Sequence, residues 1–239
     1  METILAHAQQ LVYSLLSLMP SQYQRDNLEA MLGLFLEAQG RPLPQHSKTK
    51  SASALSRFLN IYSWSTRKLI RTTREYVLQQ LLSHRPKGRR PMLQVLIDLT
   101  TLCLGIISNV ITASWKSGLF YPPNNSRVAP LLGGDDGDGF LVGWFKTAKH
   151  RFGLHRFGQG TLLGVYRWLV LSLIAYLLTH WAYLSTATTD LPDWGQAAQL
   201  ALQSILPQLL LFLFLLDLER IRPLALSYGI YIQFSRCKI

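Results

Sequence analysis

Asp98 is the residue whose position most clearly indicates chemistry. It follows an apolar run at residues 92–97, and a strongly basic segment at residues 85–91 precedes that run. A carboxylate at the end of a buried strand is placed to hold a divalent cation, and two-metal phosphoryl transfer uses such a group to bridge its ions. The pattern predicts a divalent-cation site at Asp98, but such a site needs further carboxylates.

Further candidate ligands are few. Three aspartates follow in a glycine-rich segment, and they offer oxygen ligands without the terminal Glu of a calcium-binding loop. An intact enzyme that joins them to Asp98 would need this glycine segment to hold its ligands rigidly, which such segments do poorly. These aspartates are Asp135, Asp136 and Asp138.

The composition favours a polyanionic partner. The 239 residues include 24 Lys and Arg against 13 Asp and Glu, so the net charge is +11. A charge of this size suits DNA or an anionic membrane surface. Cys103 and Cys237 form no CxxC pair, and the N-terminal stretch lacks a basic start and is interrupted by Pro20. We therefore expect reduced thiols, no signal peptide and a cytoplasmic protein.

The N-terminal third is predicted to be helical. Apolar residues at helical spacing predict helices over residues 3–18 and 21–38, and Gly40 ends the second one. A short helix capped by Ser51 or Ser53 should run through Leu59, and a longer helix capped by Ser65 should run to about residue 83. Two helices joined by a short turn resemble a helix-turn-helix, in which the second helix contacts DNA.

The longer of these helices has one basic and one apolar face. Its apolar face is formed by Leu69, Ile70, Val77 and Leu81, and its basic face by Arg67, Lys68, Arg71 and Arg74. Arg89 and Arg90 extend the basic surface. The prediction is that these side chains contact phosphates or guanine edges, and the alternative is a solvated basic face without a ligand.

A second basic segment lies at residues 143–157. It alternates cations, among them Lys146, Lys149 and Arg151, with aromatic residues. This composition suits nucleic acid held by charge and stacking. Aromatic residues at such spacing are also typical of a protein core.

Two apolar stretches follow, at residues 162–184 and 197–216. Each is close to the ~20 residues that span a bilayer. Arg167 and His180 interrupt the first, and several Gln residues and Pro207 interrupt the second. We therefore expect buried core helices and little membrane association; the alternative is a small basic membrane protein with two C-terminal hydrophobic helices.

Two blocks of the chain resemble bacterial insertion-sequence transposases of the DDE type. The blocks cover residues 20–101 and 143 to about 222. The residues that carry the resemblance are Gln22-Tyr23-Gln24-Arg25, Lys50-Ser51-Ala52-Ser53-Ala54-Leu55-Ser56-Arg57-Phe58 and Ile97-Asp98-Leu99-Thr100-Thr101. The family implies an RNase H-like domain in which three carboxylates hold two magnesium ions for cleavage and strand transfer of DNA.

The resemblance implies a damaged catalytic centre. Asp98 would be the first carboxylate, and Lys149 matches the lysine of the family's tyrosine, arginine, glutamate, lysine signature. The catalytic Glu should stand seven residues before that lysine, where this chain has Val142. No apolar strand ending in Asp follows Asp98 to supply the second carboxylate. A family member with one of three ligands should not hold Mg²⁺ productively, so we expect no catalysis.

The predicted fold class is therefore mainly α. A helical, helix-turn-helix-like DNA-binding region at residues 1–90 is followed by an incomplete RNase H-like α/β remnant and C-terminal apolar helices. The first strand of the RNase H-like core would occupy residues 91–101. Residues 102–142 would form an irregular junction left by an internal deletion, and residues 143–239 would form the C-terminal remnant of the catalytic domain. The partners implied are duplex DNA with terminal inverted repeats and an intact transposase with which this chain dimerises.

Overall fold

A computed structural model describes residues 2–37, 42–83, 147, 149–154, 159–186 and 193–233. Within these ranges the chain is mainly helical, with seven α-helices, one 3-10 turn and no strand. The helices are α1 (Glu2–Ser17), α2 (Gln22–Glu37), α3 (Ala52–Asn60), α4 (Thr66–Ser83), α7 (Leu162–Leu184), α8 (Trp194–Ile205) and α9 (Pro207–Ser227), and the 3-10 turn is η1 (Pro44–His46). The predicted mainly helical class is confirmed. The predicted strand at residues 91–101 lies outside the described ranges.

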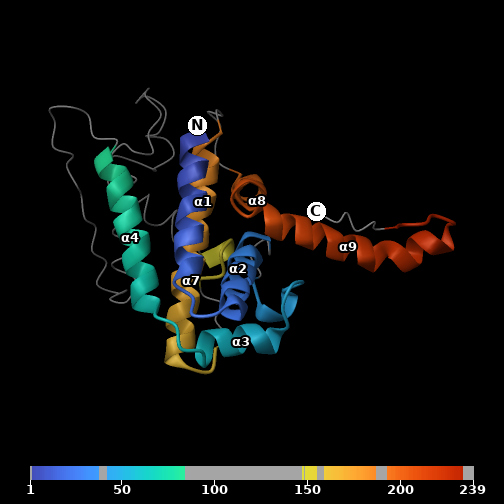
Figure 1. The fold of residues 1–239 in the computed structure, drawn as a ribbon, viewed down its shortest axis with the longest axis horizontal. Helices are drawn as coiled ribbons and strands as arrows, with labels where there is room; N and C mark the ends of the chain where they lie inside the picture. The colour runs from blue at the N-terminus through green and yellow to red at the C-terminus, as the bar shows by residue number, and fades with distance from the viewer. Residues whose placement is uncertain are drawn as a thin grey trace.

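Helix α7 is the centre of the fold. It contacts α1, α2, α3, α4 and α8, and it runs alongside α1 in Figure 1. Its Trp168 is fully buried and packs edge-on against Phe35 of α2, with ring centroids 4.8 Å apart. Because the residues of α7 are apolar on nearly every side, burial among other helices stabilises it better than a place on the surface. The helices before residue 84 and those after residue 158 thus share one hydrophobic core.

Helix α7 is long and apolar enough to cross a membrane, yet 72% of its apolar window is buried inside the protein. Its polar side chains are accommodated there, since Thr179 donates to the carbonyl of Ala175 and Ser172 to that of Phe152. In this structure α7 is a core helix, as the interrupted pattern predicts.

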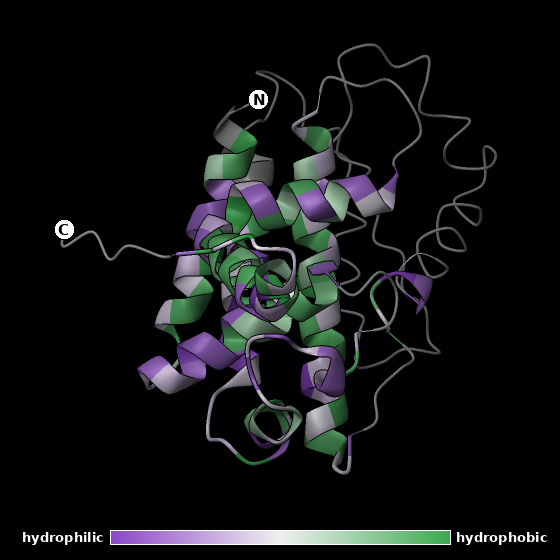
Figure 2. Ribbon diagram, turned by 90° about the vertical axis from the view of Figure 1, so that its right-hand side faces the viewer, coloured by the Kyte–Doolittle hydropathy of each residue, from purple (hydrophilic) through white to green (hydrophobic). Residues whose placement is uncertain are grey.

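The second apolar stretch is not one helix. It divides at Leu206, where α8 ends and Pro207 begins α9, and the two helices meet at a bend of 104°. Proline at the first helical position fits this break, because it lacks the N–H that would continue α8. The expectation of a second buried core helix is wrong for α9, which projects from the body in Figure 1 and is viewed nearly end-on in Figure 2. Many of its apolar side chains are exposed.

Candidate nucleic-acid interface

Helices α3 and α4 form the predicted helix-turn-helix-like unit, joined by residues 61–65. Ser51 caps α3, because its hydroxyl accepts a hydrogen bond from the amide of Ala54 at 3.3 Å. Ser65 caps α4 in the same way, accepting from the amide of Lys68 at 3.2 Å. Each cap satisfies an amide that the first helical turn leaves without a partner. These local predictions are confirmed.

The connecting turn is closed by Trp64. Its indole ring stacks on Phe58 of α3 with centroids 4.9 Å apart, and its N–H donates to the Phe58 carbonyl at 2.8 Å. Leu69 and Val77, on the inner face of α4, are buried in the core, as the apolar pattern predicts. The turn and the inner face therefore fix the direction in which α4 leaves α3.

Arg167 of α7 holds the end of α3 and the start of α4 together, and its contacts with Phe58, Leu59, Trp64 and Thr66 are called the Arg167 clamp. Its guanidinium donates to the carbonyls of Leu59 at 2.9 Å, Phe58 at 3.2 Å and Trp64 at 2.7 Å. Its Nε atom donates to the hydroxyl of Thr66, the first residue of α4, at 3.2 Å. The guanidinium also lies 4.1 Å from the centroid of the Trp64 ring, a cation–π distance.

The clamp is both electrostatic and structural. The last carbonyls of α3 carry the negative end of its dipole, so a cation there is favourable. Arg167 is only 3% exposed, and this burial lowers its pKa to about 10. Burying a charge is costly without hydrogen-bond partners, and the four acceptors around Arg167 offset that cost.

A second contact joins the end of α3 to the start of α7. The Asn60 side chain donates to Gln159 at 2.9 Å and accepts from the hydroxyl of Thr161 at 2.6 Å. Thr161 in turn caps α7 by accepting from the amide of Gly164. A side chain at position 164 would collide with Asn60, so the close approach of α3 and α7 depends on this glycine.

The outer face of α4 is basic. Arg67, Lys68 and Arg71 are exposed, and Arg74 is half-buried. Arg67, Arg71 and Arg74 lie within about 60° of one another around the helix axis. Glu75 is the only acid of α4. The structure therefore brings four of the predicted DNA-contacting residues onto one face, close to the N-terminus of the second helix of the unit.

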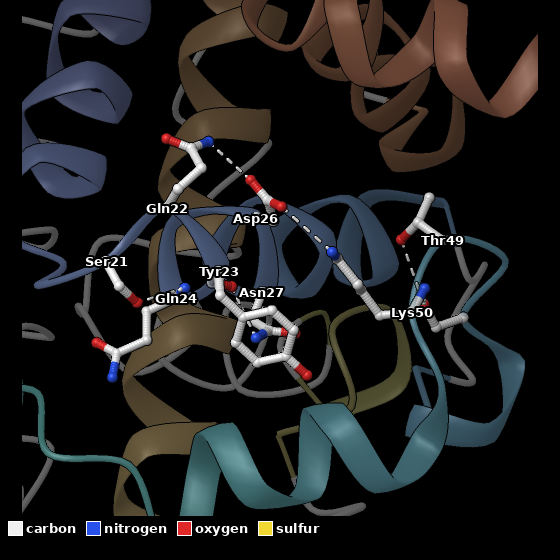
Figure 3. Close-up of polar contacts among 9 residues, drawn as sticks. Ser21, Gln22, Tyr23, Gln24, Asp26, Asn27, Thr49 and Lys50 are labelled. Atoms are coloured by element: carbon white, nitrogen blue, oxygen red, sulfur yellow. Dashed lines mark hydrogen bonds and ion pairs between the residues drawn. The ribbon is translucent and has the colours of Figure 1, made fainter.

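The start of α2 and the segment that enters α3 meet beside this unit (Figure 3). Lys50 donates to Asp26 at 3.3 Å and lies 5.4 Å from the centroid of the Tyr23 ring. Gln22 donates to the other carboxylate oxygen of Asp26 at 2.8 Å. The start of α2 and the segment that enters α3 are therefore held together by polar contacts at the protein surface. Burial raises the pKa of the Glu29 carboxyl, and the negative charge of Asp26 raises it further.

The remaining predicted residues do not join the face of α4. Lys149 is exposed. Arg151 is half-buried, and its guanidinium lies beside Gly195 at the start of α8. Burial lowers the pKa of Arg151, and the neighbouring Asp193 partly offsets that effect. Four other predicted residues lie outside the described ranges, and these are Arg89, Arg90, Asp98 and Lys146.

No group of three or more His, Cys, Asp or Glu side chains in the described ranges could hold a metal ion. The side chains brought together at the α3–α4 unit are cationic and do not fit a magnesium site.

Sequence reasoning missed the role of Arg167. Its position inside an apolar stretch indicates only that it interrupts the stretch, and its partners lie about a hundred residues earlier in the chain. The signal that could have found it is general: a buried arginine needs several acceptors, and the end of a helix supplies carbonyls. Comparison with known protein families, with curated proteins and with solved structures gives no match.

Proposed function

We propose that this chain is a duplex-DNA-binding protein of transposase origin, in which the basic face of α4 lies against the DNA. The observation that carries the proposal is the rigid mounting of that face. Arg67, Lys68 and Arg71 are exposed on a helix whose start is fixed by the buried Arg167 clamp. A preorganised row of cations loses little entropy on binding, so phosphate contacts there are more favourable than on a mobile tail.

The transposase origin rests on the quoted sequence blocks. Within the first of these blocks, Lys50 contacts Asp26 and the ring of Tyr23, so the start of α2 and the segment before α3 form one surface network. The proposal includes loss of catalysis, since the sequence supplies one of the three carboxylates that the family uses. Incubation with Mg²⁺ or Mn²⁺ and terminal-repeat DNA should therefore yield no cleaved strand, and cleavage would contradict this part of the proposal.

DNA binding is tested by fluorescence anisotropy of the full chain with a labelled duplex of about 30 base pairs in a salt series. In Arg67→Ala/Arg71→Ala the affinity should fall about tenfold, and the slope of log K against log salt should shrink by about 1.8 for two lost phosphate contacts. The control is Arg25→Ala/Arg220→Ala, which removes the same charge from exposed arginines of α2 and α9. Equal losses in the two variants would mean that net charge alone attracts the DNA, and the assignment to α4 would fail.

A small membrane protein is the second candidate, and one observation favours it: α7 has the length and composition of a spanning helix. Alkaline carbonate extraction of membranes from cells that express the chain distinguishes the two. We expect the chain in the supernatant, because the Arg167 clamp and the contacts of α7 with α1 to α4 require α7 inside the protein. Retention in the pellet would favour the membrane candidate.

A further inference from the structure

Helix α9 carries a continuous apolar stripe that no described part of the chain covers. Leu211, Phe214, Ile221 and Tyr228 are 59%, 57%, 48% and 76% exposed, and Leu218 and Ala225 between them are half-buried. Exposed apolar side chains of this size are unfavourable in water, and contiguous patches of them mark interaction surfaces. The stripe therefore needs an occupant.

The spacing of the stripe identifies the kind of occupant. Leu211, Phe214, Leu218, Ile221, Ala225 and Tyr228 follow one another at intervals of three, four, three, four and three residues. This is the a and d spacing of a heptad, which presents one seam to a second helix with the same repeat. An amphipathic seam of this kind fits another α-helix, and α9 itself has the matching repeat.

In the described part of the chain the body holds α9 at Leu209 and Leu213, and Lys48 donates a hydrogen bond to Asp217 beside the seam at 3.3 Å. Leu209 and Leu213 are the buried residues of α9, and Leu209 packs against Gly33 of α2. Leu213 lies about 140° around the helix axis from Leu218, at 100° per residue. Figure 1 shows the C-terminal part of α9 extending well beyond the other helices, so a second helix could approach it. Pro223 stands at the f position, opposite the seam, where its ring does not enter the interface.

The charges beside the seam specify a second copy in parallel orientation. Asp217 precedes Leu218 at a g position, and Arg222 follows Ile221 at an e position. In a parallel pair a g residue faces the e residue five positions later on the other helix, so each Asp217 would face an Arg222. Within one copy Asp217 pairs with Lys48 at 3.3 Å and Arg222 with Glu219 at 3.7 Å, and both side chains remain about half exposed, so pairing between copies would compete with these surface contacts. In an antiparallel pair g faces g, and Asp217 would meet Leu224 or a second Asp217. The parallel arrangement is therefore the complementary one.

A lipid bilayer fits α9 less well. The all-apolar run Leu209 to Leu216 is about 12 Å long, against about 30 Å for the hydrocarbon core of a membrane. Four charged residues follow within six positions, namely Asp217, Glu219, Arg220 and Arg222. Insertion would bury these charges or leave most of the seam outside the membrane.

We propose that two copies of this chain associate through parallel pairing of their α9 helices, with Asp217 of each copy facing Arg222 of the other. The proposal does not depend on DNA binding. It assigns a role to the apolar surface that the proposed function leaves unused.

Sedimentation velocity of the purified full chain over a concentration series tests the proposal. The wild-type protein should pass from a 27.1 kDa monomer to a species of twice that mass as its concentration rises. Ile221→Glu places a carboxylate in the seam and should raise the dissociation constant about tenfold or more. The control is Leu226→Glu, since Leu226 is 47% exposed on the same helix but stands at a b position outside the seam. This control should associate as the wild type does.

A charge exchange tests the orientation. Arg222→Asp alone should weaken association by placing two aspartates at each flank, and Asp217→Arg/Arg222→Asp should restore it. A wild-type protein that stays monomeric at every concentration would overturn the proposal, as would equal effects of Ile221→Glu and Leu226→Glu. Flotation with phosphatidylcholine–phosphatidylglycerol vesicles completes the test: vesicle binding by a protein that is monomeric in solution would assign α9 to lipid instead.

Discussion

Replacing Arg167 with Met should destabilise the whole protein and not only the α3–α4 unit. Met fills much of the same volume but donates no hydrogen bond. The carbonyls of Leu59 and Trp64 and the hydroxyl of Thr66 would lose the donors at 2.9, 2.7 and 3.2 Å. The Phe58 carbonyl would keep the indole N–H of Trp64 at 2.8 Å.

The size of the effect follows from these acceptors. Each buried carbonyl left without a donor costs about 1–3 kcal/mol, and the relief of no longer burying a guanidinium offsets part of the sum. We expect Arg167→Met to lower the free energy of unfolding by about 3–5 kcal/mol, a large share of the 5–15 kcal/mol typical of a domain. Arg167→Lys keeps the charge but not the planar fork, and it should lose roughly half as much.

Urea unfolding of the full chain, followed by circular dichroism, measures this loss. The control is Arg220→Met, which removes an exposed arginine and should stay within about 0.5 kcal/mol of the wild type. If Arg167→Met stayed within 1 kcal/mol of the wild type with an unchanged denaturant slope, the clamp would not stabilise the fold and the reasoning would be refuted.

Three further outcomes are expected from the same unfolding measurement. Ser51→Ala should cost about 1 kcal/mol through loss of the α3 cap. Gly164→Ala should cost about 1 kcal/mol net, because displacement of Asn60 outweighs the gain in helix propensity, whereas Gly160→Ala, which has open space around it, should be near neutral. Burial lowers the pKa of His180 to about 3, below its unfolded value near 6.5. Between these two values the unfolded state binds the proton more readily, so the protein becomes less stable as the pH falls. From pH 7 to pH 5 the free energy of unfolding should decrease by about 2 kcal/mol, and this decrease should be absent in His180→Phe.

Local signals in the sequence predicted local structure well. The serine caps at Ser51 and Ser65 and the apolar periodicity of α4 are encoded within a few residues, so the helices of the unit and the basic face of α4 follow from the chain directly. The bounds of α7 agree with the predicted apolar stretch for the same reason.

Features that depend on distant partners were not predictable in this way. The role of Arg167 depends on carbonyls about a hundred residues earlier in the chain, and periodicity within α7 carries no information about them. The break before Pro207 did have a local signal, since proline favours the first position of a helix. The exposure of α9 had no such local signal, because hydrophobicity alone does not distinguish a helix covered by its own chain from one whose apolar side chains are exposed.

The separation between Trp64 and Arg167 has a consequence for synthesis on the ribosome. Arg167 follows Trp64 by 103 residues, so at about 10 residues per second the α3–α4 unit emerges about ten seconds before its clamp exists. During that interval the carbonyls at the end of α3 are hydrated and the apolar faces of α1, α2 and α4 lack α7. The nascent chain should therefore be a substrate for holding chaperones until α7 is made, and a truncated product that stops before residue 162 should be degraded or aggregate.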